Sequence, residues 1–274
     1  RVTQPALSAG IAELERLVGT PLFLRNRRQI RLTEAGGRFL PIARDLDRGF
    51  QAADDFGRAG DRQTTGVKLG VIRSAPDELL QAIVAALRPS FAIEIVESSD
   101  SELRAALGSG RINVALVPLR SGEQGARILR LYEETLAMFV ANGHPLAGRI
   151  EVRPDELAAE TMVARRSCEF LAATSRFFTR HGVRPRFALR SESDGRCLRM
   201  VAAGCGITTA PVSLAIDGIV PLKVVGYDFR RRLGLILDPA WAALPDVDPL
   251  LAHARETIAA IAAEWHRNRV TPAL

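Results

Sequence analysis

The stretch that decides how the N-terminal region folds is residues 3–36, TQPALSAGIAELERLVGTPLFLRNRRQIRLTEAG. Apolar side chains recur in its first half at intervals of four, three and four residues, the spacing of one helix face. They are Leu7, Ile11, Leu14 and Val18. Thr3 is placed to cap this helix, and Gly19 with Pro21 to end it.

The opposite face of the predicted helix carries small or amide-bearing groups, which can approach the edges of nucleic-acid bases closely. These groups belong to Gln4, Pro5, Ser8 and Ala9. A basic run follows, and we expect it to form a hairpin that can hold phosphates. Its arginines are Arg25, Arg27, Arg28 and Arg31.

A family resemblance rests on these same residues. The segments QPALS at 4–8, LF at 22–23 and LTEAG at 32–36 resemble the recognition helix and wing of LysR-type transcriptional regulators. The intervening residues that share the pattern are Ile11, Leu14, Glu15, Leu17, Gly19 and Arg25. The chain departs from it at Ala9 and Gly10, where family members often carry longer polar or basic side chains.

The resemblance implies a winged helix-turn-helix that binds double-stranded DNA. It implies that the recognition helix faces the major groove, through Thr3, Gln4, Pro5 and Ser8. The arginines of the wing, Arg25, Arg27, Arg28 and Arg31, would contact phosphates. The family's domain begins with two further helices that this sequence does not include, so residues 1–33 are expected to form a partial domain.

Residues 34–63 are predicted to form a long linker helix. Apolar residues step by three or four along it, and charged residues fill most of the other faces. The apolar residues are Phe39, Ile42, Leu46, Phe50, Ala53 and Phe56. So narrow a stripe suits a seam between two helices, and the resemblance implies that subunits pair there in a homodimer or homotetramer. The alternative is a surface helix packed on its own domain.

From Val67 onward, strands and helices alternate. Strand patterns at 67–72, 91–96 and 112–117 enclose helical patterns at 77–87 and 101–107, which predicts a parallel sheet with right-handed crossovers. A second alternating set includes strand candidates at 136–141, 162–164 and 207–210, with helices at 169–181 and 249–265.

Segments 91–117 and 198–211 resemble the effector domain of the same family. The expected fold class is therefore α/β: a partial winged helix-turn-helix and linker helix, followed by a two-lobed periplasmic-binding-protein-like (type 2) effector domain at 66–274. Lobe I is expected at about 66–139 and 240–274, and lobe II at about 140–239.

Three turns follow strands of this expected fold, at the edge where ligands of open α/β sheets bind. They combine helix starts, hydroxyls and arginines, which favour an anion. The residues are Arg73, Ser74, Ala75, Ser98, Ser99, Arg165, Arg166, Ser167 and Cys168. We expect them to bind a small anionic effector, a carboxylate. The alternative is that the serines only cap helices and the arginines are solvated.

Cys168 also raises the question of redox sensing. It follows two arginines at a predicted helix start, and both features lower a thiol pKa. Its place resembles that of the reactive cysteine in peroxide-sensing members of the family. The second cysteine expected a few residues downstream is absent from residues 169–180, so we favour a small-molecule effector.

Composition narrows the remaining possibilities. At 274 residues and 47% hydrophobic content the chain is long enough for about two domains, and it contains no transmembrane run. A net charge of +6 favours a polyanionic partner or an anionic ligand. The odd count of three cysteines fits a reducing compartment, so we expect a cytoplasmic protein without membrane contact.

Enzyme motifs are missing from the sequence. The four histidines are scattered, and no nucleophile elbow, P-loop or dinucleotide-binding glycine motif is present. We therefore predict no catalytic residue, metal ligand or cofactor, and a DNA-binding transcriptional regulator controlled by a small effector. The alternative function is a stand-alone solute-binding protein without DNA-binding activity.

Overall fold

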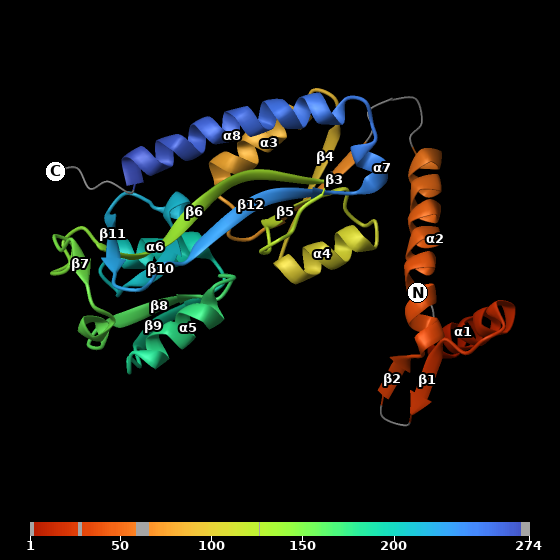
Figure 1. Ribbon diagram of the computed structural model, residues 1–274, viewed down its shortest axis with the longest axis horizontal. Helices are drawn as coiled ribbons and strands as arrows, with labels where there is room; N and C mark the ends of the chain where they lie inside the picture. Colours follow the sequence, from red (N-terminus) through yellow and green to blue (C-terminus); the bar gives the residue numbers. More distant parts are fainter. Residues whose placement is uncertain (1–2, 27–28, 59–65, 126, 270–274) are drawn as a thin grey trace. The chain divides into compact units, whose positions relative to one another are not determined.

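The computed structural model describes residues 3–26, 29–58, 66–125 and 127–269, which Figure 1 traces. The chain divides into two compact units, Arg1–Gln63 with Gly108–Arg111, and Thr64–Leu107 with Ile112–Leu274. None of the helices in the described ranges has the length and apolar character that crossing a membrane requires.

The first unit opens with helix α1 (Gln4–Val18), where the apolar spacing predicts it. Gly19 ends the helix in the left-handed region at φ 73°, and its N–H donates to the Glu15 carbonyl. An antiparallel hairpin follows, formed by β1 (Phe23–Asn26) and β2 (Gln29–Leu32). The Glu15 carboxylate accepts the backbone N–H groups of Leu22 at 2.7 Å and Phe23 at 2.9 Å, which attaches the helix to the hairpin.

Helix α2 (Glu34–Arg58) begins directly after the hairpin. Thr33 Oγ1 donates to the Pro21 carbonyl at 2.8 Å and accepts the Gly36 N–H at 2.9 Å, so one hydroxyl caps α2 and holds the preceding turn. The last residues of the predicted linker helix, 59–63, lie outside the described residues.

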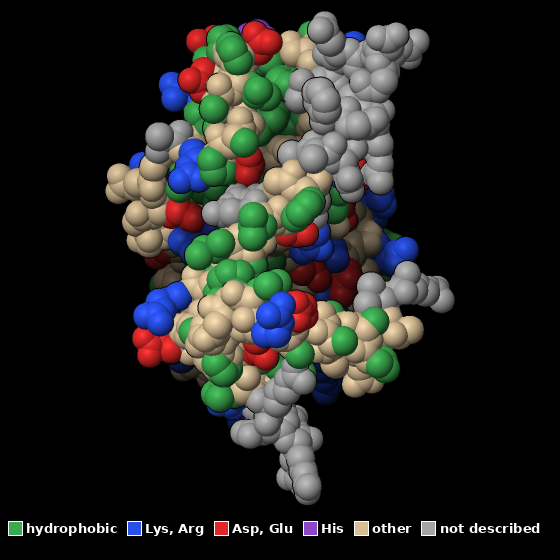
Figure 2. Space-filling model, turned by 90° about the vertical axis from the view of Figure 1, so that its right-hand side faces the viewer, with side chains coloured by type: hydrophobic (Ala, Val, Ile, Leu, Met, Phe, Trp, Pro, Cys, Tyr) green, Lys and Arg blue, Asp and Glu red, His purple; other side chains and the backbone are tan. Residues whose placement is uncertain are grey.

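Along α2 three residues of the apolar stripe predicted from the sequence, Ile42, Leu46 and Phe50, face solvent, while Phe39 is half-buried. The exposed fractions are 54% for Ile42, 57% for Leu46 and 74% for Phe50. Large hydrophobic side chains also reach the surface among basic and acidic ones on the face drawn in Figure 2. A row of exposed apolar side chains on one helix is a feature of surfaces that bind a partner.

The second unit begins with lobe I, in which three parallel strands alternate with helices as the sequence predicts. The strands are β3 (Gly66–Ile72), β4 (Ala92–Ser98) and β5 (Val114–Pro118), with β3 between the other two. The helices are α3 (Asp77–Leu87), α4 (Asp100–Gly108) and, from the end of the chain, α8 (Val247–Arg269). α8 packs along α3, as Figure 1 shows, and covers a core that includes Leu69, Ile83 and Ile258.

Two long strands join the lobes, β6 (Ile128–Ala141) and β12 (Arg230–Leu237). The first half of β6 pairs with β12, and its second half pairs with β10 (Thr208–Pro211) and β11 (Ile219–Val224). The sequence predicted only 136–141 as a strand, which is too short. Residues 128–135 are held by pairing with β12, about a hundred positions away, and local periodicity does not reveal such pairing.

Lobe II is an α/β lobe around β8 (Thr161–Arg165) and β9 (Arg186–Ser191), which are parallel. Helix α5 (Leu171–Arg180) starts two residues later than predicted, and α6 (Asp194–Ala202) follows β9. The smaller elements are β7 (Glu151–Val152), η1 (Pro154–Leu157), η2 (Val212–Leu214) and α7 (Pro239–Ala242), the last of which lies in the sequence between β12 and α8. The predicted fold class is confirmed: a mixed α/β, two-lobed periplasmic-binding-protein-like unit accompanies the helix-turn-helix elements.

Candidate functional site

A buried guanidinium connects the two lobes. Arg231, on β12, has a side chain with 0% exposure. Its Nη1 donates to Glu169 Oε1 of lobe II at 2.7 Å and to Ser74 Oγ of lobe I at 2.9 Å, while Nη2 donates to the Ser74 carbonyl at 3.0 Å. Its Nε donates to Glu134 Oε1 on β6 at 2.8 Å. The inter-lobe cluster therefore consists of Arg231, Glu134, Glu169 and Ser74.

Glu134 fixes one side of the Arg231 guanidinium. Its side chain is 1% exposed, and it accepts three separate donors: Arg231 Nε, the Ser213 N–H at 2.9 Å and the Tyr132 hydroxyl at 2.9 Å. Burial and the nearby Glu134 charge raise the pKa of Tyr132, so its hydroxyl stays protonated and able to donate.

Glu169 closes the other side of Arg231. Its Oε2 accepts the Ser74 hydroxyl at 3.0 Å, and its Oε1 accepts Arg231 Nη1. Burial alone would raise the pKa of the Glu169 carboxyl, but the Arg231 guanidinium outweighs burial and leaves this pKa below its usual value. Glu169 is therefore ionised at neutral pH.

The predicted turn at residues 165–168, after β8, makes its hydrogen bonds within lobe II. Arg165 is buried, and its Nε donates to Asp194 Oδ1 at 2.8 Å while its Nη1 donates to the Thr209 carbonyl at 3.1 Å. Ser167 Oγ donates to the same Asp194 oxygen at 2.8 Å. A ligand anion at Arg165 would have to displace Asp194. Arg166 is exposed, and its N–H donates to the Ser191 carbonyl at 2.8 Å.

The other two predicted turns, at residues 73–75 and 98–99, lie side by side. The Arg73 N–H donates to the Ser98 carbonyl at 3.3 Å. Within the second turn, Ser98 and Ser99 turn their hydroxyls toward Glu102, and these hydrogen bonds lower the pKa of the Glu102 carboxyl to about 2. Ser99 thus caps α4, because its Oγ also accepts the Glu102 N–H at 3.4 Å, whereas Ser98, at the end of β4, only donates to the Glu102 carboxylate. The Ala75 N–H donates to the Ile72 carbonyl at 2.9 Å, which closes the first turn.

Cys168 lies in surroundings that disfavour a thiolate. It is 8% exposed, and burial raises the pKa of its thiol although Arg165 acts in the opposite direction. Cys197 is buried as well, and burial also raises its pKa. Cys205 is the exposed cysteine. The arginines that precede Cys168 therefore do not activate it, contrary to what their position in the sequence suggested.

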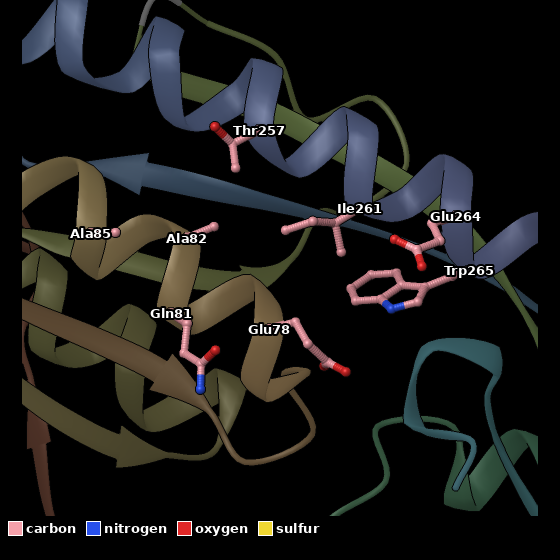
Figure 3. Close-up of a pocket in the computed structure, with 8 residues that line it drawn as sticks. All are labelled: Glu78, Gln81, Ala82, Ala85, Thr257, Ile261, Glu264 and Trp265. Atoms are coloured by element: carbon pink, nitrogen blue, oxygen red, sulfur yellow. The ribbon is translucent and has the colours of Figure 1, made fainter. Parts of the chain in front are cut away.

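Two hollows are lined by none of the four residues of the inter-lobe cluster, although the first is lined in part by Arg165 and by Cys168, the chain neighbour of Glu169. One, of about 240 Å³, lies in lobe II between β8 and α5 and is lined mainly by apolar side chains such as Met162, Leu171 and Phe187. The other, of about 480 Å³, is a groove between α3 and α8, where Ile261 and the Trp265 ring face α3 (Figure 3). Glu78 and Glu264 line this groove, and their negative charge makes it unsuitable for an anion.

The residues predicted to contact DNA are exposed where the structure describes them. Thr3, Gln4, Pro5 and Ser8 lie at the start of α1, and Arg31 is exposed on β2. The backbone of Arg25 belongs to β1, whereas Arg27 and Arg28 lie outside the described residues. Within the described ranges, no group of three His, Cys, Asp or Glu side chains is placed to hold a metal ion.

An exposed helix with a hairpin on one unit, and two lobes joined by crossing strands on the other, are the parts expected of a DNA-binding protein that responds to a ligand. Comparison with protein families agrees. Residues 1–37 match the bacterial regulatory helix-turn-helix proteins of the lysR family, and residues 60–259 match the LysR substrate binding domain. The chain therefore belongs to the LysR family of transcriptional regulators.

Two relatives are similar over most of the chain. The transcriptional regulator TtuA of Agrobacterium vitis is 31% identical over 84% of this chain and 79% of its own length. A probable hydrogen peroxide-inducible genes activator of Mycobacterium avium is 30% identical over 85% of this chain and 74% of its own. These relatives are regulators, and both family matches lie on one chain, so neither an enzyme nor a stand-alone solute-binding protein is favoured.

Solved structures show the same fold. A cysteine mutant of Corynebacterium glutamicum OxyR superimposes with a TM-score of 0.57 at 25% identity, over 96% of this chain and 88% of that one. Full-length BenM superimposes with a TM-score of 0.54 at 21% identity, over 96% and 89%. At this level of identity the BenM likeness concerns the fold alone.

Proposed function

We propose that this LysR-family regulator contacts DNA with the polar face of α1 and the arginines of the hairpin, under the control of a small carboxylate bound between the lobes. The observation that carries the proposal is the buried Arg231 guanidinium, which meets both lobes and already holds carboxylates. A buried arginine is the side chain best suited to recognise a carboxylate.

The DNA contacts divide into two kinds. Gln4 and Ser8 are four residues apart and therefore share one helix face, from which an amide and a hydroxyl can reach base edges in the major groove. Thr3 and Pro5 flank them at the start of the same helix. Arg25, Arg27, Arg28 and Arg31 would contact phosphates, which positions the protein without reading sequence.

The exposed stripe on α2 supports pairing with a second copy of this chain. Ile42, Leu46 and Phe50 are more than half exposed, and burying them against the same stripe of another subunit would remove apolar area from water. A homodimer would also present two copies of α1 to DNA, the arrangement that symmetric half-sites require.

A carboxylate effector accounts for the site better than peroxide does. Some relatives are named as hydrogen peroxide-inducible activators, and reaction with peroxide needs an accessible thiolate. In this chain Cys168 is buried and its pKa is raised, whereas Arg231 provides a ready partner for a carboxylate. The proposed effector is therefore an anion, not an oxidant.

Base reading by α1 is tested with DNA taken from upstream of the adjacent gene and with the same DNA shuffled. In the full-length protein, Gln4→Ala or Ser8→Ala should lower the ratio of the two affinities about tenfold, because a base contact is lost. Glu13 lies on the opposite face of α1, so Glu13→Gln should change both affinities alike. An unchanged ratio in both α1 variants would refute base reading by this face.

A further inference from the structure

We infer that Arg231 and Ser74 form a carboxylate-binding subsite that the protein's own Glu169 occupies, and that a ligand carboxylate acts by displacing Glu169. The inference rests on the proposed inter-lobe effector and names the group with which that effector competes.

The geometry at Glu169 is that of a bound carboxylate ligand. Each of its oxygens has its own donor: Arg231 Nη1 lies 2.7 Å from Oε1, and Ser74 Oγ lies 3.0 Å from Oε2. The two donors come from different elements, β12 and the turn after β3, and neither element belongs to the segment that carries Glu169. Any small carboxylate placed there would meet the same pair of donors.

Of the two carboxylates on Arg231, Glu169 is the exchangeable one. Glu134 lies on the crossing strand β6, is 1% exposed and accepts three donors. Glu169 lies in the loop between β8 and α5, is 14% exposed, and accepts its two side-chain hydrogen bonds from the donors of the subsite. Glu134 is thus a positioning residue that keeps Arg231 in place when Glu169 leaves.

Charge defines the class of ligand. The cluster holds one guanidinium and two carboxylates, so exchange of Glu169 for another monocarboxylate leaves the buried charge unchanged. A dianion would add a further negative charge to a buried cluster that already holds one more carboxylate than guanidinium, which costs free energy. A neutral ligand would offer Arg231 Nη1 and the Ser74 hydroxyl no charged acceptor, so these hydrogen bonds would be weaker. The subsite therefore favours a small monocarboxylate.

Displacement would also provide a signal. Through Glu169, lobe II is bonded to Ser74 of lobe I and to the crossing strand β12. A ligand that replaces the Glu169 carboxylate removes both bonds and allows the β8–α5 loop to move relative to lobe I. Because the ligand binds only the displaced state, it shifts the population toward that state.

The test uses acetate as the probe and thermal unfolding of the chain at pH 7 as the measurement. Glu169→Ala removes the internal carboxylate, so the Tm of this variant should fall. Sodium acetate should raise the Tm of the variant in a saturable manner. Sodium chloride at equal ionic strength should not raise it. The Tm of the unmodified chain should hardly respond to acetate, because Glu169 fills the subsite.

Two matched variants separate subsite binding from general effects. Glu169→Gln fills the same volume with an amide, so acetate should not restore its Tm. Glu123→Ala removes a carboxylate that pairs with Arg104 in a more exposed setting, with side chains 22% and 15% exposed, and should not respond to acetate either. If Glu169→Ala does not fold alone, acetate should restore folding during dilution from denaturant.

An acetate response that is equal in all variants, or absent from Glu169→Ala in both experiments, would overturn the subsite. The measurement involves no DNA, so its failure leaves the DNA contacts of the proposed function untouched. Conversely, loss of base reading by α1 would not alter the acetate response.

Discussion

Replacing Arg231 by methionine is expected to lower the free energy of unfolding at pH 7 by about 3–5 kcal/mol, because two buried carboxylates then lose their cation. Glu134 and Glu169 would remain with only hydroxyl and N–H donors. Urea unfolding of both proteins, followed by far-ultraviolet circular dichroism, measures the difference.

The loss should depend on pH in a defined direction. Arg231 lowers the pKa of Glu169, so its contribution is present above the carboxyl's usual pKa of about 4.5 and is lost as pH falls through the lowered folded value. In Arg231→Met the unpaired carboxyls can take up protons in acid, which relieves their burial. The gap between the two proteins should therefore narrow as pH falls from 7 toward 5.

The neighbouring Arg232 provides the control. It pairs with Glu133 on the surface, where the two side chains are 53% and 36% exposed. Exposed pairs contribute about 0–1 kcal/mol, so Arg232→Met should change stability little and show no comparable pH dependence. Equal losses in the two variants would contradict a special role for the buried cluster.

Gly36→Ala is expected to be the most damaging small substitution in the first unit. Gly36 lies in the first turn of α2, and a Cβ there would overlap the backbone carbonyl of Leu22. Because the obstacle is backbone rather than a flexible side chain, the hairpin and α2 must move apart, at a cost of about 3 kcal/mol. Amide hydrogen exchange of α1 and the hairpin should accelerate about 100-fold, and DNA binding should be lost.

Gly37 is the matched control, one residue along the same helix. A Cβ at Gly37 meets nothing within 4 Å. Gly37→Ala should stabilise α2 by about 0.5–1 kcal/mol, since alanine favours helix more than glycine does. Unchanged exchange in Gly36→Ala would show that the hairpin and α2 are not packed as described.

The sequence was most informative where structure is local. The period of Leu7, Ile11 and Leu14 predicts α1, and the alternation of strands and helices from Val67 predicts the parallel order of lobe I. Both signals arise from residues close together in the chain, so periodicity and capping suffice to read them. The two-lobed arrangement of the second unit, by contrast, is predicted only with the help of the family resemblance.

The centre of the inter-lobe cluster was missed because it is assembled from distant residues. Glu134 and Arg231 are 97 positions apart, and Ser74 and Arg231 are 157 apart. Glu134 and Arg231 read in the sequence as ordinary polar residues beside apolar runs. Ser74 was selected because it follows a strand, but nothing local indicated that an arginine of β12 would bind it. Arg231 is the central residue of the run Arg230–Arg232 at the start of β12, and no local signal distinguishes it from its two neighbours.

The remaining predicted effector residues show why short motifs are ambiguous. Serines just before a helix bind either a ligand or the helix itself, and Ser98 and Ser99 bind Glu102 of the helix that follows them, α4. Arginine beside a strand end binds either an anion or a neighbouring carboxylate, and Arg165 has Asp194. Whether such a serine or arginine binds a ligand or a side chain of the protein depends on residues that are distant in the sequence and close in the fold.

The central claim is that the first unit lies against a DNA duplex and that its hairpin arginines hold phosphates. The most direct test is the salt dependence of affinity for the upstream DNA, measured for the full-length protein and for its Arg25→Gln and Arg31→Gln variants. Each substitution should reduce the slope of log affinity against log salt by about 0.9, equally for specific and shuffled DNA. A slope that neither substitution changes would contradict the claim.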